Sequence, residues 1–126
     1  MQVADSKMQV VWEPIADLAK SVNSGSVSAL ELVEKSLGLI EEHKEFNSII
    51  ATTETRAKQR AKQIDSDIAD GKTVGRLAGV PFVAKDNFLT FGSETTAASN
   101  ILKGFVAPYQ STAIDKLEAE GAICVA

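Results

Sequence analysis

Lys85 is the residue in this sequence with the clearest potential for proton transfer. It directly follows an apolar run of strand length, residues 80–84, in the segment LAGVPFVAKDNFLT. A lysine at the end of a buried strand would be partly stripped of water, and desolvation favours the neutral amine that can accept a proton. From composition alone, a solvated lysine at a strand end is the more common arrangement. Lys85 is therefore a catalytic candidate, and the residues around it must show whether it is catalytic or simply solvated.

Polar residues follow Lys85 closely and could form a substrate pocket beside it. Asp86 could orient the lysine or bind backbone amides at a turn, and Asn87 tolerates the tight backbone expected there. Local turns formed by Ser, Thr and Asp side chains explain such a segment almost as well as a pocket does. The loop FGSETTAAS carries three hydroxyl residues that could line the pocket, namely Thr95, Thr96 and Ser99.

The composition excludes several other kinds of site. The 126 residues carry a formal net charge of −4 and contain one cysteine, Cys124, and one histidine, His43. Direct binding of a phosphate backbone is therefore disfavoured, and neither an intramolecular disulfide nor a conventional zinc site can form. The sequence GKT at 71–73 ends like a phosphate loop, but Ser66 stands where that motif needs glycine. We expect no metal site.

The first 70 residues are predicted to be mainly helical. Pro14 suits the first turn of a short helix. Ser28 and Glu31 form a capping box for a second helix that reaches about Lys44. The run FNSIIAT at 46–52 is either a short strand or an extended approach to the next helix.

A third helix is predicted from Thr53 or Thr55, either of which can cap it, to about Ala69. Its apolar positions make a narrow seam, so the helix is expected to lie on the surface. Its basic residues are interpreted as a solvated face rather than an RNA contact, since acidic residues follow closely. The seam consists of Ala57, Ala61, Ile64 and Ile68, and the basic residues are Arg56, Lys58, Arg60 and Lys62.

Residues 71–126 are predicted to start an α/β core. Residues 80–84 and 122–126 have the length and composition of buried strands. Between them, Ser111 or Thr112 can cap a helix that runs to about residue 120, with Ala113, Ile114 and Leu117 facing inward. Strand, helix and strand make a parallel unit, which places Lys85 at the carboxyl end of a strand, where parallel sheets carry functional residues.

Three segments carry a resemblance to the amidase signature family: GVPFVAKDN, the TTAAS loop, and FVAPYQSTAIDKLEAEGA. Within that family the chain is similar to the A subunits of glutamine-dependent aminoacyl-tRNA amidotransferases, from about residue 15 onward. The resemblance implies an α/β fold with N-terminal helices followed by the first strands of a mixed sheet. The expected organisation is a single partial domain, residues 1–126, whose core is incomplete.

The resemblance also implies a chemistry, in which a Ser, cis-Ser, Lys triad hydrolyses amides. Lys85 matches the triad lysine, and both serines belong to the family region that follows residue 126. Three serines that the chain does contain, Ser93, Ser99 and Ser111, do not fall in the family's nucleophile motif. We therefore expect the chain alone to be inactive, because an isolated lysine has no hydroxyl to activate.

The resemblance further implies what the complete protein would work with. The complete subunit would release ammonia from glutamine, and a partner subunit would use ATP and Mg²⁺ to convert Glu-tRNA(Gln) to Gln-tRNA(Gln). This chain would bind no cofactor itself and would meet tRNA only through the complex. No apolar stretch approaches the roughly 20 residues that span a bilayer, and the first residues lack a leader pattern, so we expect a cytoplasmic protein.

Two alternatives stay open. The chain could be a non-catalytic assembly module or part of a general amidase that acts on other carboxamides. An incomplete sheet leaves an open strand edge, and such an edge pairs readily with another chain. The expected partners are therefore the remaining amidotransferase subunits or a second copy of this chain in a homodimer.

Overall fold

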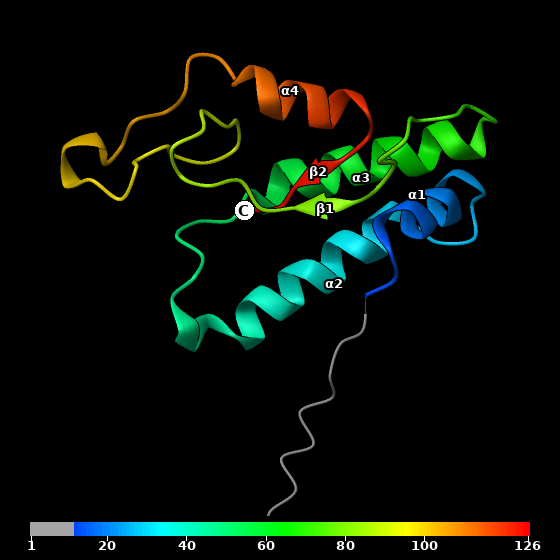
Figure 1. Cartoon of the computed structure of the whole chain (residues 1–126), viewed down its shortest axis with the longest axis horizontal. Helices are drawn as coiled ribbons and strands as arrows, with labels where there is room; N and C mark the ends of the chain where they lie inside the picture. Colours follow the sequence, from blue (N-terminus) through cyan, green and yellow to red (C-terminus); the bar gives the residue numbers. More distant parts are fainter. Residues whose placement is uncertain (1–11) are drawn as a thin grey trace, which may run out of the picture.

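The computed structural model describes residues 12–126 as helices followed by a helix-linked pair of strands (Figure 1). The two strands lie between α4 on one side and α2 on the other, as expected for an incomplete α/β core. The predicted fold class is confirmed, whereas the division at residue 70 stays a prediction. The elements are α1 (Ile15–Asn23), α2 (Ala29–Glu42), η1 (Lys44–Phe46), α3 (Glu54–Ala69), β1 (Pro81–Phe82), η2 (Asn100–Leu102), α4 (Thr112–Ala119) and β2 (Ile123–Cys124).

Among residues 12–126, no helix combines the length and the apolar character that crossing a bilayer requires. The expectation that the chain starts without a leader pattern falls on residues 1–11, which lie outside the described part of the chain.

Ser28 is the N-cap of helix α2, as the sequence predicts, but the second capping side chain is Asp65 and not Glu31 of the predicted capping box. The Ser28 hydroxyl accepts hydrogen bonds from the backbone of Leu30 and Glu31. The carboxylate of Asp65, in α3, accepts a further bond of 2.7 Å from Ala29 N and one of 3.1 Å from Leu30 N. A carboxylate at this position satisfies free N–H groups and complements the helix dipole. The cap therefore also ties α2 to α3.

The apolar core lies between the helices and the strands. The predicted seam of α3 is confirmed, because Ala57 and Ala61 are fully buried and Ile64 is nearly so. Small side chains at this seam let α2 and α3 pack closely, and these two helices make the most extensive contact of the fold. The other buried apolar residues of this core are Leu18, Ala19, Val22, Ala29, Leu32, Val33, Ala78, Val80, Ile123 and Val125.

The two strands are parallel and pair Pro81 with Ile123 and Phe82 with Cys124. Backbone bonds of 2.9 Å continue on both sides, from Ile123 N to Val80 O and from Ala84 N to Ala126 O. The hydrogen-bonded ladder therefore covers the first predicted run, 80–84, and residues 123–126 of the second, whereas the Ala122 N–H bonds to Leu117 O of α4. Residues 47–53 form no strand, so the extended approach to α3 is the correct one of the two alternatives.

Thr53 joins the start of α3 to the end of β2. Its hydroxyl donates a 2.7 Å bond to Cys124 O, and its N–H donates a 3.0 Å bond to Val125 O. Thr53 is 1% exposed, and no side chain caps α3 at its N-terminus. The predicted threonine cap is therefore wrong, because the hydroxyl is engaged by the strand. The link holds the approach to α3 beside the carboxyl end of the sheet.

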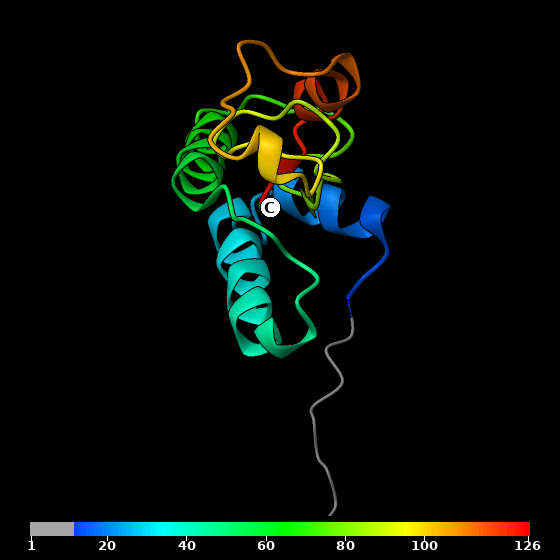
Figure 2. The same ribbon diagram turned by 90° about the vertical axis from the view of Figure 1, so that its left-hand side faces the viewer.

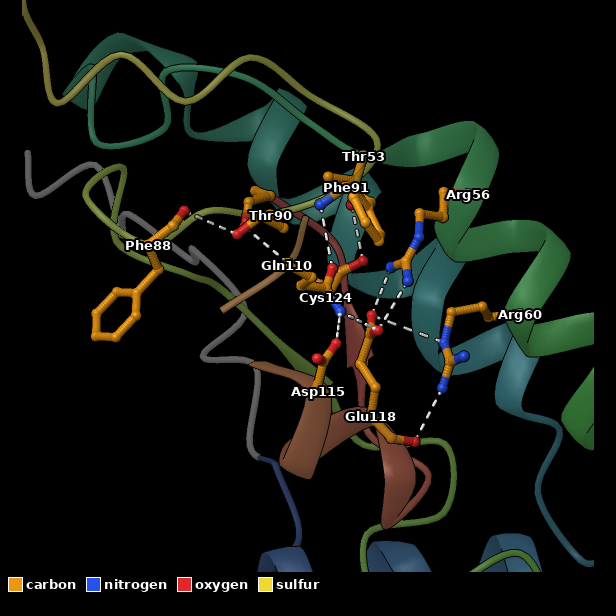
Figure 3. Close-up of polar contacts among 11 residues, drawn as sticks. Thr53, Arg56, Arg60, Phe88, Thr90, Phe91, Gln110, Asp115, Glu118 and Cys124 are labelled. Carbon is orange, nitrogen blue, oxygen red and sulfur yellow. Dashed lines mark hydrogen bonds and ion pairs between the residues drawn. The ribbon is translucent and has the colours of Figure 1, made fainter. Parts of the chain in front are cut away.

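Helix α4 turns a carboxylate toward α3 (Figure 3). Ile114 and Glu118, four residues apart on one face, are the buried residues of α4. Glu118 pairs with Arg56, which is therefore not part of a solvated basic face as predicted. Because the face with Ile114 and Glu118 is the buried one, Ala113 is exposed and Leu117 is 37% exposed. Of the three residues predicted to face inward, only Ile114 is buried.

Gly121 ends α4 in a backbone conformation that leaves no room for a side chain. Its φ is +92°, and a Cβ there would lie 2.8 Å from Ala78 Cα and 3.0 Å from Val74 O. Gly104 has a similar φ of +87° with no atom within 4 Å of the same position, so it is a matched control. We expect Gly121→Ala to lower the free energy of unfolding by about 2 kcal/mol and Gly104→Ala by about 1 kcal/mol or less. Urea unfolding of both variants checks this, and equal losses would contradict it.

Candidate functional site

A cavity of about 460 Å³ opens at the carboxyl ends of β1 and β2. Its walls come from residues 48–51 before α3, 83–88 after β1, the 93–98 loop and Ala126. Figure 2 looks onto this end of the molecule, with the η2 loop in front of the carboxyl terminus. The cavity therefore lies where a parallel sheet is expected to carry functional residues. Four of the predicted site residues line it, namely Lys85, Asp86, Asn87 and Thr95.

Lys85 lies on the cavity wall immediately after the last ladder bond of β1, which runs from Ala84 N to Ala126 O. Its own carbonyl accepts a 2.9 Å bond from Phe88 N, which closes a turn around Asp86 and Asn87. The predicted burial of the lysine is wrong, because Lys85 is exposed. Desolvation requires a covering segment on the open side of the cavity, and residues 12–126 provide none. None of the ion pairs among residues 12–126 includes the Lys85 side chain.

Asp86 binds the 96–98 segment. Its carboxylate accepts bonds from Thr96 N at 2.9 Å, from Ala98 N at 3.3 Å and from the Thr96 hydroxyl. Its carbonyl accepts a 2.7 Å bond from Ala97 N. The hydroxyl of Thr96 contributes most to holding the pKa of this carboxyl below its ordinary value, with the two backbone N–H groups adding to it. Of the two predicted roles for Asp86, binding backbone amides is the one observed.

The other pocket candidates divide into cavity residues and turn residues. Asn87 is exposed and lines the cavity, and Thr95 is buried in its wall with its hydroxyl 3.4 Å from Thr90 N. The Ser99 hydroxyl accepts a bond from Ile101 N and so caps η2. Thr96 and Ser99 do not line the cavity. The local-turn interpretation is correct for Ser99, whereas the Thr96 hydroxyl donates to the carboxylate of Asp86, ten residues away.

Apolar side chains also line the cavity, and they were not among the predicted site residues. Ile49 and Ile50 belong to the FNSIIAT run, and Val83 and Phe88 flank Lys85. Ile50, Val83 and Phe88 are 64%, 55% and 41% exposed. The signal in the sequence was the adjacent pair Ile49 and Ile50, in a run that the sequence left open as a short strand or an extended approach to the next helix.

The arrangement places Lys85 where acid–base chemistry becomes possible once the side chain is desolvated. A neutral amine at this place can accept a proton from a hydroxyl that is brought into the cavity, whereas an ammonium group exposed to water cannot. Residues 12–126 contain no group of three or more His, Cys, Asp or Glu side chains placed to hold a metal ion.

The chain belongs to the amidase family, whose model matches residues 31–126. Among curated proteins it is 41% identical to the A subunit of mitochondrial glutamyl-tRNA(Gln) amidotransferase from Ornithorhynchus anatinus, and 43% identical to the protein of the same name from Xenopus laevis. Each match extends over 109 residues, which is 86% of this chain and 21% of the relative. The chain thus spans about a fifth of the length of these relatives.

Solved structures agree with the family. A bacterial aryl acylamidase of the amidase signature family superimposes with a TM-score of 0.82 at 28% identity. That match covers 90% of this chain and 24% of the acylamidase chain. The resemblance expected from GVPFVAKDN and the later segments is therefore confirmed at the level of family and fold.

Proposed function

We propose that this chain is the lysine-bearing segment of the A subunit of a glutamine-dependent aminoacyl-tRNA amidotransferase. The observation that carries the proposal is the place of Lys85, next to a cavity at the carboxyl ends of two parallel strands. Identity of 41% and 43% to two curated A subunits supports this substrate class over other amides.

In the proposed reaction, Lys85 acts as the proton acceptor. Its neutral amine withdraws a proton from the bridging cis-serine, which in turn takes the proton of the nucleophilic serine. The serine oxygen then attacks the carboxamide carbon of glutamine. As the tetrahedral intermediate collapses, the proton held by Lys85 returns through the cis-serine to the leaving nitrogen, so the C–N bond breaks and ammonia leaves an acyl-enzyme. Water hydrolyses the acyl-enzyme to glutamate. A partner subunit would use the ammonia together with ATP and Mg²⁺ to convert Glu-tRNA(Gln) to Gln-tRNA(Gln).

The 126-residue chain alone should be inactive in this scheme. It holds the lysine, whereas the two serines would come from the family region beyond residue 126. The exposure of Lys85 supports this expectation, because a proton acceptor of this kind requires a drier environment than the open cavity gives. A cytoplasmic location stays a prediction, since both of these relatives are named as mitochondrial proteins.

A chimeric protein tests the proposal. The 109 matched residues of the Xenopus laevis protein are exchanged for those of this chain, and the chimera is assayed in its complex for ammonia release from glutamine. We expect glutaminase activity within about tenfold of the parent complex, and none from the 126-residue chain. A chimera that assembles but releases no ammonia would contradict the proposed function. Activity on an aryl acylamide in place of glutamine would support the general-amidase alternative instead.

An assembly role is the second candidate, and exposed apolar side chains favour it. Eight large ones lie within residues 83–109, a high concentration for a surface loop. They could contact the remaining subunits or a second copy of this chain. An assembled but inactive chimera, or a dimer of the 126-residue chain in light scattering, would favour this role. The eight are Val83, Phe88, Phe91, Ile101, Leu102, Phe105, Val106 and Tyr109.

A further inference from the structure

We propose that Asp86 is a positioning residue whose carboxylate holds residues 96–98 in place, so that Ala97 and Ala98 form a wall of the cavity that Lys85 lines. Its use in amide hydrolysis rests on the proposed function, whereas its effect on the loop does not. Asp86 was expected to orient the lysine or to bind backbone amides, and here the bound amides give it a role in shaping the pocket.

The hydrogen bonds of Asp86 are concentrated on one short segment. Three consecutive residues, Thr96, Ala97 and Ala98, each donate their backbone N–H to Asp86, two to the carboxylate and one to the carbonyl. The Thr96 hydroxyl adds a fourth bond. With these donors the carboxylate is engaged in holding the loop and is poorly suited to exchange protons with a substrate.

The segment needs this support because its backbone is strained. Ala97 has a φ of +48° and Ala98 a φ of +55°. Residues with a Cβ rarely adopt this left-handed region, and two in succession persist only when the surroundings hold them there. Both alanines line the cavity, so a relaxed loop would change the shape of the pocket.

Asp86 couples this wall to Lys85 through the chain itself. The two residues are adjacent, and the turn from Lys85 O to Phe88 N fixes the backbone on both sides of Asp86. A shift of the loop is therefore transmitted to the lysine, and misplacement of a catalytic group by about 1 Å can reduce rates by about 10²-fold.

Two variants separate positioning from acid–base catalysis. The substitution Asp86→Asn keeps the shape of the side chain and one acceptor oxygen, so most of the loop bonds survive. Asp86→Ala removes all bonds to the carboxylate. We expect the chimeric protein to lose about 10²-fold in kcat/KM with Asp86→Ala and less than about tenfold with Asp86→Asn. Equal and severe losses would overturn positioning, because a proton-transfer role is abolished by both changes.

NMR of the 126-residue chain provides a readout that needs no activity. We expect Asp86→Ala to shift the Cα and Cβ resonances of Ala97 and Ala98 and to speed amide exchange of Ala98 at least about tenfold, while the ladder amides of Ala84 and Val125 are unchanged. Unchanged resonances and exchange at residues 97 and 98 would overturn the proposal.

If Asp86→Ala fails to fold, Thr96→Val, which removes only the hydroxyl bond, is expected to give smaller shifts of the same resonances. If Asp86→Ala changes the resonances of Ala97 and Ala98 but the chimeric protein has no glutaminase activity, the proposed function is rejected. The role of Asp86 in holding the loop is then still supported.

Discussion

Replacing Lys85 with alanine is expected to lower the glutaminase activity of the chimeric complex about 10³-fold. In the proposed reaction the amine is the final acceptor of the nucleophile's proton, so its removal leaves the serines without a base. The protein should remain folded, because an exposed side chain without a partner contributes within about 0.5 kcal/mol to stability. The loss should appear in kcat/KM from steady-state ammonia release.

Lys85→Arg distinguishes a proton acceptor from a fixed positive charge. Arginine keeps the charge and much of the length but does not release its proton in proteins. We therefore expect this variant to be as inactive as Lys85→Ala. Lys103→Ala is the matched control, an exposed lysine in the loop after η2, and its activity should not change. If Lys85→Arg keeps most of the activity, the lysine acts by charge and the triad role is wrong.

The elements that the sequence predicted well are those specified by neighbouring residues. Ser28 caps α2 and Ser111 caps α4 because each hydroxyl meets N–H groups two or three positions ahead. The seam of α3 follows from helical spacing alone. The approximate positions of both strands were also predictable from neighbouring residues, because a run of five apolar residues marks each strand.

Contacts between distant parts of the chain escaped the sequence analysis. Thr53 or Thr55 was expected to cap α3, but no side chain caps this helix and the Thr53 hydroxyl bonds to Cys124 O, 71 residues away. Arg56 was assigned to a solvated face, yet it pairs with Glu118, 62 residues away. A polar side chain such as that of Thr53 or Arg56 can bind either a nearby or a distant partner. The sequence alone does not show which of the two it binds in the fold.

The site was only partly predictable for a similar reason. The position of Lys85 follows from the strand that precedes it, whereas its burial depends on what covers the cavity. Asp86 was recognised as a turn former or a support for the lysine, and only the fold brings the 96–98 segment within its reach. The isoleucines of residues 48–51 reach the cavity because Thr53 fixes that segment beside β2.

Replacing Glu118 with alanine is expected to lower the free energy of unfolding by about 3 kcal/mol. The Glu118 side chain is 7% exposed and that of Arg56 24% exposed, and the two form a bidentate pair with Arg56 Nη2 2.7 Å from Glu118 Oε2 (Figure 3). Gln110 Nε2 donates a further 2.7 Å bond to the same carboxylate. Removing the acceptor leaves a half-buried guanidinium and an amide without their partner.

The loss would also loosen the loop that carries the site. Gln110 bridges Glu118 to the loop, because its Oε1 accepts a 3.1 Å bond from Phe91 N. Glu54→Ala is the matched control, since Glu54 pairs with Lys58 on the surface of α3, and it should cost less than about 0.5 kcal/mol. Chemical unfolding of both variants measures the difference, and equal losses would show that the buried pair adds nothing beyond a surface one.

The contribution of Glu118 should also depend on pH. Burial raises the pKa of Glu118, but hydrogen bonds from Arg56 and Gln110 and the charge of Arg56 outweigh it, so the pKa lies below its ordinary value. A group whose pKa is lowered by folding stabilises the protein above its unfolded pKa, about 4.3 for glutamate, and loses this contribution as the pH falls through the folded pKa. The difference in stability between the wild-type chain and Glu118→Ala should therefore be largest near pH 7 and shrink below about pH 4. A difference that stays constant from pH 7 to pH 3 would mean that the ionised carboxylate is not what stabilises the contact between α3 and α4.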